Sequence, residues 1–171
     1  PDTYLKPEEP VEKVYVAPEV GHKFRVEPPG FYKQVLLELI EARIREINDA
    51  IQILKDLIAK EFDKLTLHEK LSMRYLIIEL VEATASICIH ILMNMYNEKP
   101  EGYPDCFIRL GMKGIVPENL AKKLALAARL RNLLVHRYWF IDDGKVYENV
   151  KKGLKDFEEF VTYIRKFLEN K

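Results

Sequence analysis

Residues 131–138 read RNLLVHRY and place an arginine, a histidine and a tyrosine near the end of an otherwise apolar helical pattern. The guanidinium of Arg131 offers a fixed fork of N–H donors that matches a phosphate group, and histidine is the side-chain type that most readily exchanges protons near neutral pH. Together they indicate phosphodiester chemistry. On an RNA substrate, His136 would take the proton of the ribose 2′-hydroxyl or protonate the leaving oxygen, while Arg131 stabilises the phosphorane.

Arg131 and His136 lie five residues apart, which on a helix means about 140° of rotation and ~7.5 Å of rise. One copy of the motif therefore does not make a tight pair. Two copies that meet across a two-fold axis, the commonest oligomer symmetry, would line one groove with two arginines and two histidines. The sequence predicts such a homodimer with a composite site that needs no metal or other cofactor. Asn132, one turn before His136, would orient the imidazole or hold a phosphate oxygen.

A purely structural interpretation of the same residues stays open. In it Arg131 pairs with a carboxylate such as Glu82, and His136 caps a helix end. Tyr138 and Trp139 then close the core. Both interpretations keep Arg131 at the centre.

Glu79 and Glu82 have the spacing of paired carboxylates for acid–base work, but three-residue spacing is also typical of a solvated helix face. Glu82 falls among apolar residues, where a charge needs a partner such as Arg131 or Arg74. We therefore expect Glu82 to support the site and not to react.

The charge balance limits how the chain can bind nucleic acid. The 171 residues suit one domain with a real core, and 27 basic residues match 27 acidic ones. Any contact with RNA must be local, because there is no global basic field. Residues 119–141 contain no acidic side chain but five cations. The remaining histidines, His22, His68 and His90, lack metal-ligand neighbours, so no metal site is expected.

The two cysteines suggest a reducing compartment. Cys88 and Cys106 form no C-x-x-C pair, and Cys88 lies in an apolar run where a free thiol behaves as a small hydrophobe. No stretch approaches eighteen uninterrupted apolar residues, and no charged-then-apolar leader opens the sequence. We therefore expect a soluble cytoplasmic protein without a membrane span.

The chain divides near Gly30. Residues 1–30 hold six of the nine prolines and predict an extended arm, whose short alternating stretches we expect to dock across the dimer. Residues 31–171 show helical periodicity instead. The predicted fold is all-α: an up-and-down homodimeric bundle of four long helices plus one short one.

The helices are predicted from apolar spacing and from start signals. Thr66 and Glu69 form a capping-box pattern, and Pro117 suits a first helical position. Asp142-Asp143-Gly144 marks a turn. The expected segments are a helix over 31–62, a second from 67 to about 92, a short one at 106–110, a fourth from 117 to 138 and a last one over 150–168.

The motif, in this helix order, resembles the signature of the HEPN domain superfamily, specifically its HepT-like toxin branch. Residues 131–138 match the branch pattern of arginine, four residues, histidine, one residue and tyrosine, followed by Ile141-Asp142. Residues 74–83, which end in Glu-Ala, are similar to the second-helix segment of the family. The resemblance covers residues 31–171 and leaves the arm outside.

The resemblance implies a metal-independent endoribonuclease of the HepT/MntA toxin–antitoxin type, built as a dimer. Arg131 and His136 become the catalytic pair. The implied partner is a minimal nucleotidyltransferase antitoxin that adds AMP to Tyr138, which would block the RNA groove by bulk and charge. The alternative is a non-catalytic HEPN adaptor that binds nucleotide, RNA or a nucleotidyltransferase.

Overall fold

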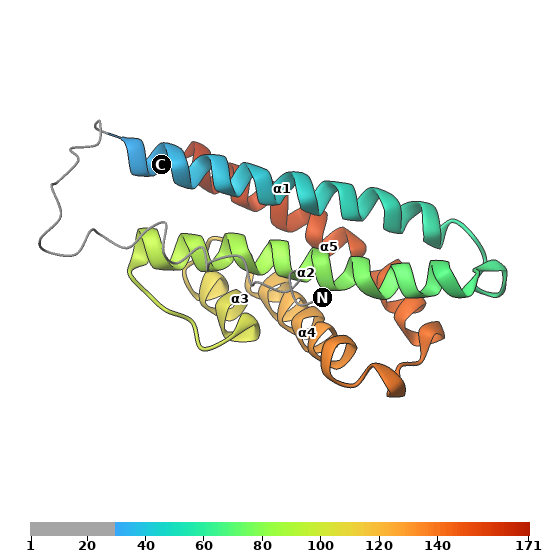
Figure 1. Ribbon diagram of the computed structural model, residues 1–171. Coiled ribbons are helices and arrows are strands. Elements are labelled where there is room, and N and C mark those ends of the chain that lie inside the picture. The colour runs from blue at the N-terminus through green and yellow to red at the C-terminus, as the bar shows by residue number, and fades with distance from the viewer. Residues whose placement is uncertain (1–29) are drawn as a thin grey trace, which may run out of the picture. The chain divides into compact units, whose positions relative to one another are not determined.

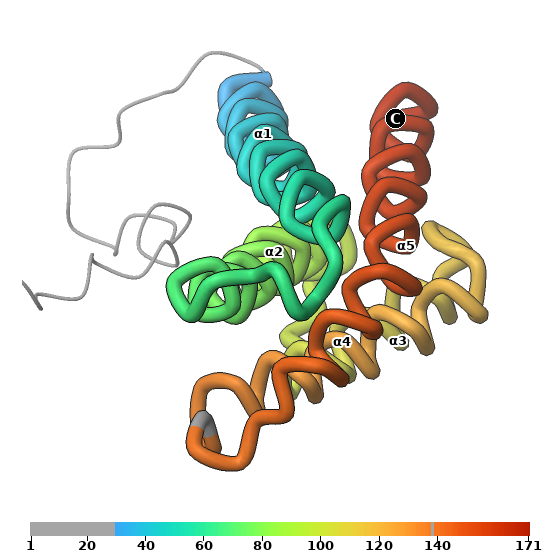
Figure 2. The backbone as a smooth tube through the Cα atoms, turned by 90° about the vertical axis from the view of Figure 1, so that its right-hand side faces the viewer, coloured from blue at the N-terminus to red at the C-terminus, as the bar shows by residue number. Residues whose placement is uncertain are grey.

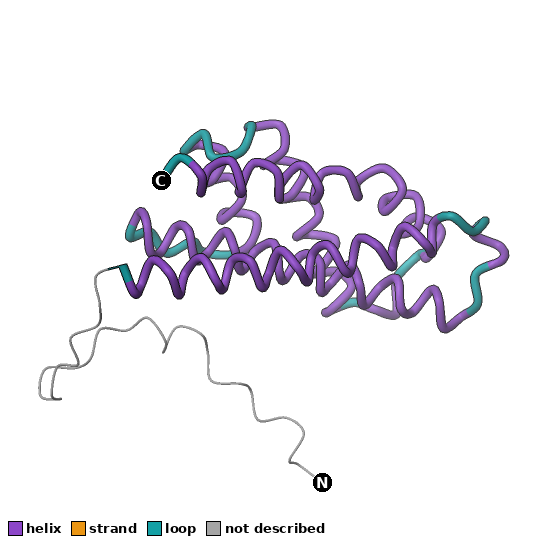
Figure 3. Tube along the Cα trace, turned by 90° about the horizontal axis from the view of Figure 1, so that it is seen from above, coloured by secondary structure: helices purple, strands orange, loops and turns teal. Residues whose placement is uncertain are grey.

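The computed structural model describes residues 30–171, except for the side chain of residue 138, so the predicted arm lies outside the described residues. This part of the chain is helical and contains no strand (Figures 1 and 3). The prediction of four long helices and one short one is confirmed. The elements are α1 (Phe31–Ile58), α2 (Leu67–Tyr96), α3 (Tyr103–Met112), α4 (Glu118–His136) and α5 (Asp143–Glu169), with short 3-10 turns η3 (Phe62–Lys64) and η4 (Tyr138–Phe140).

Residues Lys33–Lys171 form one compact unit built around α2. Figure 1 shows α1 and α5 above α2 and α3 and α4 below it, and Figure 2 shows that α4 also lies next to α5. Lys55 pairs with Glu158, and Arg165 pairs with Glu41 at 2.8 Å, which ties α1 to α5. Buried apolar side chains from all five helices make up the core.

α1 is amphipathic, and its buried residues recur at three- and four-residue spacing. The helix ends at Ile58 and not at Phe62, as the apolar pattern had indicated. The hydroxyl of Tyr147 on α5 donates a hydrogen bond to the Lys60 carbonyl oxygen at 2.7 Å. This bond satisfies a carbonyl just past the helix end, where no further helical N–H is available.

α2 begins with the predicted capping box. The Glu69 N–H donates to Thr66 Oγ1 at 3.2 Å, and the Thr66 N–H donates to Glu69 Oε2 at 2.9 Å. By length and composition α2 is apolar enough to cross a membrane, which the sequence analysis did not recognise, but 67% of its apolar window is buried inside the protein. That burial is typical of the core helix of a soluble protein.

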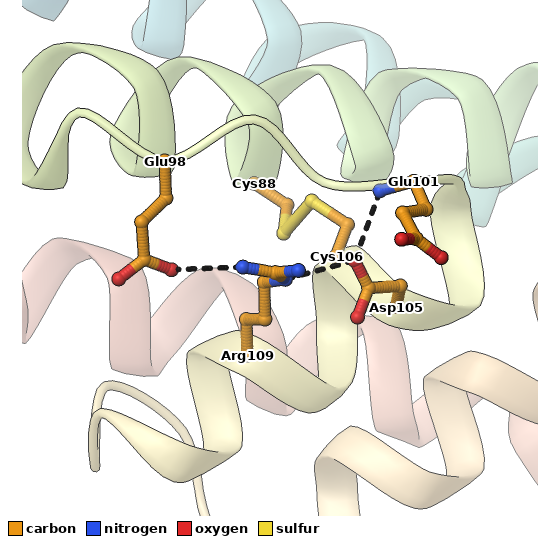
Figure 4. Close-up of a disulfide and its surroundings, with 6 residues drawn as sticks. All are labelled: Cys88, Glu98, Glu101, Asp105, Cys106 and Arg109. Carbon is orange, nitrogen blue, oxygen red and sulfur yellow. Dashed lines mark hydrogen bonds and ion pairs between the residues drawn. A yellow bond between two sulfur atoms is a disulfide. The ribbon is translucent and has the colours of Figure 1, made fainter.

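α3 is longer than predicted and is covalently joined to α2. It begins at Tyr103, with Pro104 in its first turn. Cys88 and Cys106, both fully buried, form a disulfide with their Cα atoms 6.2 Å apart (Figure 4). The prediction of a free Cys88 thiol is therefore wrong. The cysteines no longer support the prediction of a reducing compartment. The pairing depends on how α3 packs on α2, which the 18-residue separation does not reveal.

Both ends of the α4–α5 connection differ from the prediction. Arg137, with φ −137°, ends α4 after His136, so Tyr138 falls in η4 and not on the apolar stripe of α4. α5 starts at Asp143, earlier than expected. Asp142 is its N-cap and accepts hydrogen bonds from the Gly144 and Lys145 N–H groups at 3.0 and 3.2 Å.

Candidate active site

Arg131 on α4 forms an ion pair with Glu82 on α2, in which Nη2 donates to Glu82 Oε1. The arginine side chain is 21% exposed, and its Nε is buried with no hydrogen-bond partner among the described groups. The pairing that the structural interpretation anticipated is present. Arg74, the other partner considered for Glu82, instead forms a two-point pair with Asp143 at 2.6 and 2.9 Å.

The second oxygen of Glu82 is also bound. The hydroxyl of Tyr103, the first residue of α3, donates to Glu82 Oε2. The Arg131 guanidinium carbon lies 5.2 Å from the centre of the Tyr103 ring, within cation–π range. Burial raises the pKa of Tyr103 to about 12, and the hydrogen bond and negative charge of Glu82 act in the same direction. The hydroxyl is therefore a donor at any physiological pH.

Sequence reasoning missed Tyr103, because it began the short helix only at residue 106. Pro104 was the available signal, since proline is favoured in the first turn of a helix. Followed by Cys106, Phe107 and Leu110, all buried, it marks a helix that starts at Tyr103.

Asn132 lies beside Arg131. Its Oδ1 accepts a hydrogen bond from Arg131 Nη1 at 3.0 Å. The arginine thus engages the amide oxygen, and the NH2 group of Asn132 is the part left for the predicted role toward His136 or a phosphate oxygen. One N–H on each Nη atom of Arg131 then has no partner among the described residues, and guanidinium N–H groups suit a phosphate.

His136 is the last residue of α4, and its side chain is exposed. Within residues 30–171 no hydrogen bond joins it to Arg131 or Asn132. Within one copy of the chain the two motif residues are therefore apart, as helix geometry predicted. Trp139 and Phe140 are 62% and 76% exposed, so Trp139 does not close the core. Tyr138, the expected modification target, begins η4 two residues after His136.

The segment 119–141 keeps its cationic character in the fold. Lys123 is partly neutralised by Asp156 at 3.5 Å, whereas Arg129 and Arg137 are exposed. Arginines on the exposed part of α4 give this end of the helix a local positive field without a net charge on the chain. Chemically, the site offers a held arginine, an exposed imidazole and nearby cations, which suits an anionic polymer.

A family model described as "Ribonuclease HepT-like" matches residues 24–164. The chain belongs to this family. Among curated HepT-like proteins, it is 31% identical to the tRNA nuclease HepT of Aphanizomenon flos-aquae over 137 residues, which cover 76% of this chain and 90% of that protein. The sequence-based recognition of a HepT-like HEPN protein is confirmed.

Solved structures show the same fold. A tri-AMPylated Shewanella oneidensis HEPN toxin, determined in complex with its MNT antitoxin, superimposes with a TM-score of 0.70. The match covers 75% of this HepT-like chain and 97% of the toxin at 24% identity. It confirms the HEPN helical fold.

A short stretch of the chain has a different relative. It is 53% identical over 45 residues to DNA polymerase 2 of Aeropyrum pernix, which covers 25% of this chain but only 6% of the polymerase. So small a share of the polymerase carries no statement about polymerase activity here.

Proposed function

We propose that this HepT-like protein is a metal-independent endoribonuclease toxin whose active site is composed of two copies of the motif. The observation that carries the proposal is that one helix bears both an arginine held by Glu82 and, at its end, an exposed histidine. Arg131 and His136 are the catalytic residues, and Glu82 and Asn132 support the arginine. Held cations and exposed acid–base groups are what phosphodiester transesterification requires.

The step needs a base and an acid on opposite sides of the phosphate. One His136 takes the proton of the ribose 2′-hydroxyl, whose oxygen then bonds to phosphorus. The bond to the 5′-oxygen breaks, and the His136 of the second copy gives that oxygen a proton. Arg131 stabilises the added negative charge on the phosphorane. The products are a 2′,3′-cyclic phosphate and a 5′-hydroxyl.

Exposed apolar side chains on α2 support the homodimer. Leu67, Leu71 and Tyr75 are 66%, 46% and 65% exposed. Tyr75 lies seven residues before Glu82, nearly two full turns, so this apolar stripe leads along one helix face to the site. Contiguous exposed hydrophobic residues mark interaction surfaces. A second copy on this face would bring its own α4 end near the first.

The test is cleavage of total RNA in excess EDTA by the unmodified protein, with its new RNA ends analysed. Mass spectrometry first establishes that Tyr138 carries no AMP. We expect wild-type protein to leave 2′,3′-cyclic phosphate ends and His136→Ala to leave RNA intact. His68→Ala is the matched control, because His68 is also an exposed histidine, at the start of α2.

The outcomes separate three cases. Equal cleavage by wild type and His136→Ala contradicts the catalytic role of His136. Cleavage that stops in EDTA contradicts metal independence. If neither protein cleaves, the nuclease proposal falls and the adaptor function below replaces it.

We further propose that a cognate minimal nucleotidyltransferase restrains this protein by adding AMP to Tyr138. The solved neighbour is an AMPylated toxin bound to its MNT antitoxin, which supports a partner of this chemistry. Tyr138 begins η4 two residues after His136, so phosphate and purine added there would sit where RNA must enter. Purified partner plus ATP should raise the mass of the Tyr138 peptide by AMP units. A stable complex with an unchanged peptide mass contradicts this proposal.

The second candidate is a non-catalytic HEPN adaptor. The Arg131–Glu82 pair favours it, because an arginine already neutralised by a carboxylate also serves to brace helices. Growth distinguishes the candidates. Expression of the wild type without its partner should slow growth, and His136→Ala should relieve the effect. Equal growth with both forms supports the adaptor.

We place the protein in the cytoplasm, where RNA and an ATP-using partner are available. A structural neighbour at 20% identity and TM-score 0.62 is a cytosolic protein, YutE of Bacillus subtilis. Fractionation of cells that express the native protein tests this placement.

A further inference from the structure

We infer that Tyr103 is a positioning residue that fixes Glu82, and through it Arg131, for the phosphate. The inference rests on the proposed nuclease function and adds a residue from a third helix to its site. Tyr103 donates to one oxygen of Glu82 while Arg131 donates to the other. The contact thus joins α3 to the pair that α2 and α4 make.

A carboxylate with a single partner can rotate about its side-chain torsions and carry that partner with it. Glu82 side-chain atoms are 36% exposed, so burial alone does not hold the group in place. The Tyr103 hydroxyl occupies the second oxygen and leaves one orientation of the carboxylate in which both bonds are made. Hydrogen bonds to a charged group are the stronger kind, which makes this restraint effective.

The ring of Tyr103 restrains Arg131 directly as well. It lies 5.2 Å from the guanidinium carbon, and the arginine Nε beside it is buried without an acceptor in the described structure. The guanidinium is therefore held by the aromatic ring, by Glu82 and by Asn132, and one N–H on each Nη atom keeps no partner among the described residues. These N–H groups are of the kind that donate to phosphate oxygens.

Tyr103 can act in this way because α3 is itself fixed on α2. The disulfide joins Cys106 on α3, one turn after Tyr103, to Cys88 on α2, less than two turns after Glu82. Arg109 on α3 also donates to Glu98, in the segment that follows α2, at 3.3 Å, and to Asp105 on α3 itself at 2.8 Å (Figure 4). The start of α3 therefore has little freedom to move away from Glu82.

The first test compares steady-state cleavage by wild type and Tyr103→Phe. The variant keeps the ring and loses only the hydroxyl. We expect kcat to fall about tenfold with KM changed less than about twofold, because positioning acts on the transition state. In a Glu82→Gln background, where the charged acceptor is gone, Tyr103→Phe should change kcat by less than about twofold. Additive losses, or an unchanged kcat in the wild-type background, overturn the inference.

Tyr147→Phe is the matched control. It also loses a hydroxyl that donates a hydrogen bond, to the Lys60 carbonyl oxygen, but it lies on α5 at the end of α1. A general weakening of the fold would lower activity in both variants. We expect Tyr147→Phe to lower the melting temperature and to leave kcat at the wild-type value.

A second measurement does not depend on nuclease activity. The NMR order parameter of the Arg131 Nε–Hε group, assigned by its loss in Arg131→Lys, reports how rigidly the side chain is held. We expect it to fall in Tyr103→Phe and to stay unchanged in Tyr147→Phe. If wild-type protein does not cleave RNA, the nuclease proposal fails, and this order parameter alone decides whether Tyr103 positions Arg131. An unchanged value overturns the inference.

Discussion

The two ends of the RNLLVHRY motif lie in contrasting environments although one helix carries both. Arg131 is mostly buried and contacts Glu82 and Tyr103, so three helices hold it. His136 is exposed at the last position of α4 and has no hydrogen bond to another described residue. On the proposed function, a monomer thus holds in advance the residue that would bind the phosphate. We infer that the proton-transfer part is completed only when another surface covers the helix end.

The sharpest test of this contrast is His136→Ala. Because the side chain is exposed, we expect the melting temperature to stay within about 1 °C, since surface substitutions rarely change stability. Cleavage should fall about 10³-fold, the typical loss for a general acid–base residue. Thermal unfolding and cleavage assays on the same preparation check both values. A marked loss of stability would show that His136 is part of the packed structure.

Arg131→Ala should affect activity and stability together. Removing the guanidinium leaves Glu82 without its cationic partner, which we expect to cost about 1–2 kcal/mol in this partly exposed setting. Cleavage should fall about 10²-fold, as when one donor to a developing anion is removed. Urea denaturation and cleavage rates measure the two effects. Double substitution with Glu82→Gln should recover part of the stability and none of the cleavage.

The sequence predicted the parts of this site that local rules govern. Apolar spacing and the Thr66–Glu69 capping box located the helices, because those signals act within one or two turns. The Arg131–Glu82 pair was foreseen as an alternative, since a charge in an apolar stripe needs a partner. The Tyr103 contact was not foreseen, because it depends on how a third helix packs.

The disulfide was missed for the same reason. Cys88 and Cys106 are on different helices, and nothing in their spacing indicates that they meet. The end of α4 was placed two residues too late, because apolar spacing continues to Tyr138 although the backbone leaves the helix at Arg137. Periodicity describes side chains, and it does not report where the backbone turns.

Loss of the disulfide is expected to weaken the fold and the Arg131 end of the site. Replacing both cysteines with alanine removes a crosslink over 18 residues, which should lower the free energy of unfolding by about 3 kcal/mol. Urea denaturation measures this loss. Where the variant is folded, cleavage by Cys88→Ala/Cys106→Ala should fall below that of Tyr147→Phe, which keeps the wild-type rate, because the start of α3 is less restrained. Equal cleavage by the two variants would show that Tyr103 positions Glu82 without help from the disulfide.

The smallest expected effect is at alkaline pH. The native pKa of Tyr103 is raised to about 12, above the value of about 10 in the unfolded chain, so the fold favours the protonated form. This contribution is complete below pH 10 and is lost between pH 10 and 12. Relative to Tyr103→Phe, wild-type stability should fall over that range by about 1 kcal/mol at this half-buried position. Urea midpoints at pH 9 and pH 11.5 give the comparison. An equal change of the urea midpoint in the two proteins would contradict this expectation.

Trp139 is the only tryptophan in the 171 residues, and it lies 62% exposed directly after Tyr138. Its fluorescence is therefore a signal from η4, just after the end of α4, with no tryptophan background from the core. A second copy, an RNA strand or an AMP group that reached this end would dehydrate or quench the indole and shift its emission. The protein carries its own optical reporter for every event proposed at His136, and titrations can follow those events without a label.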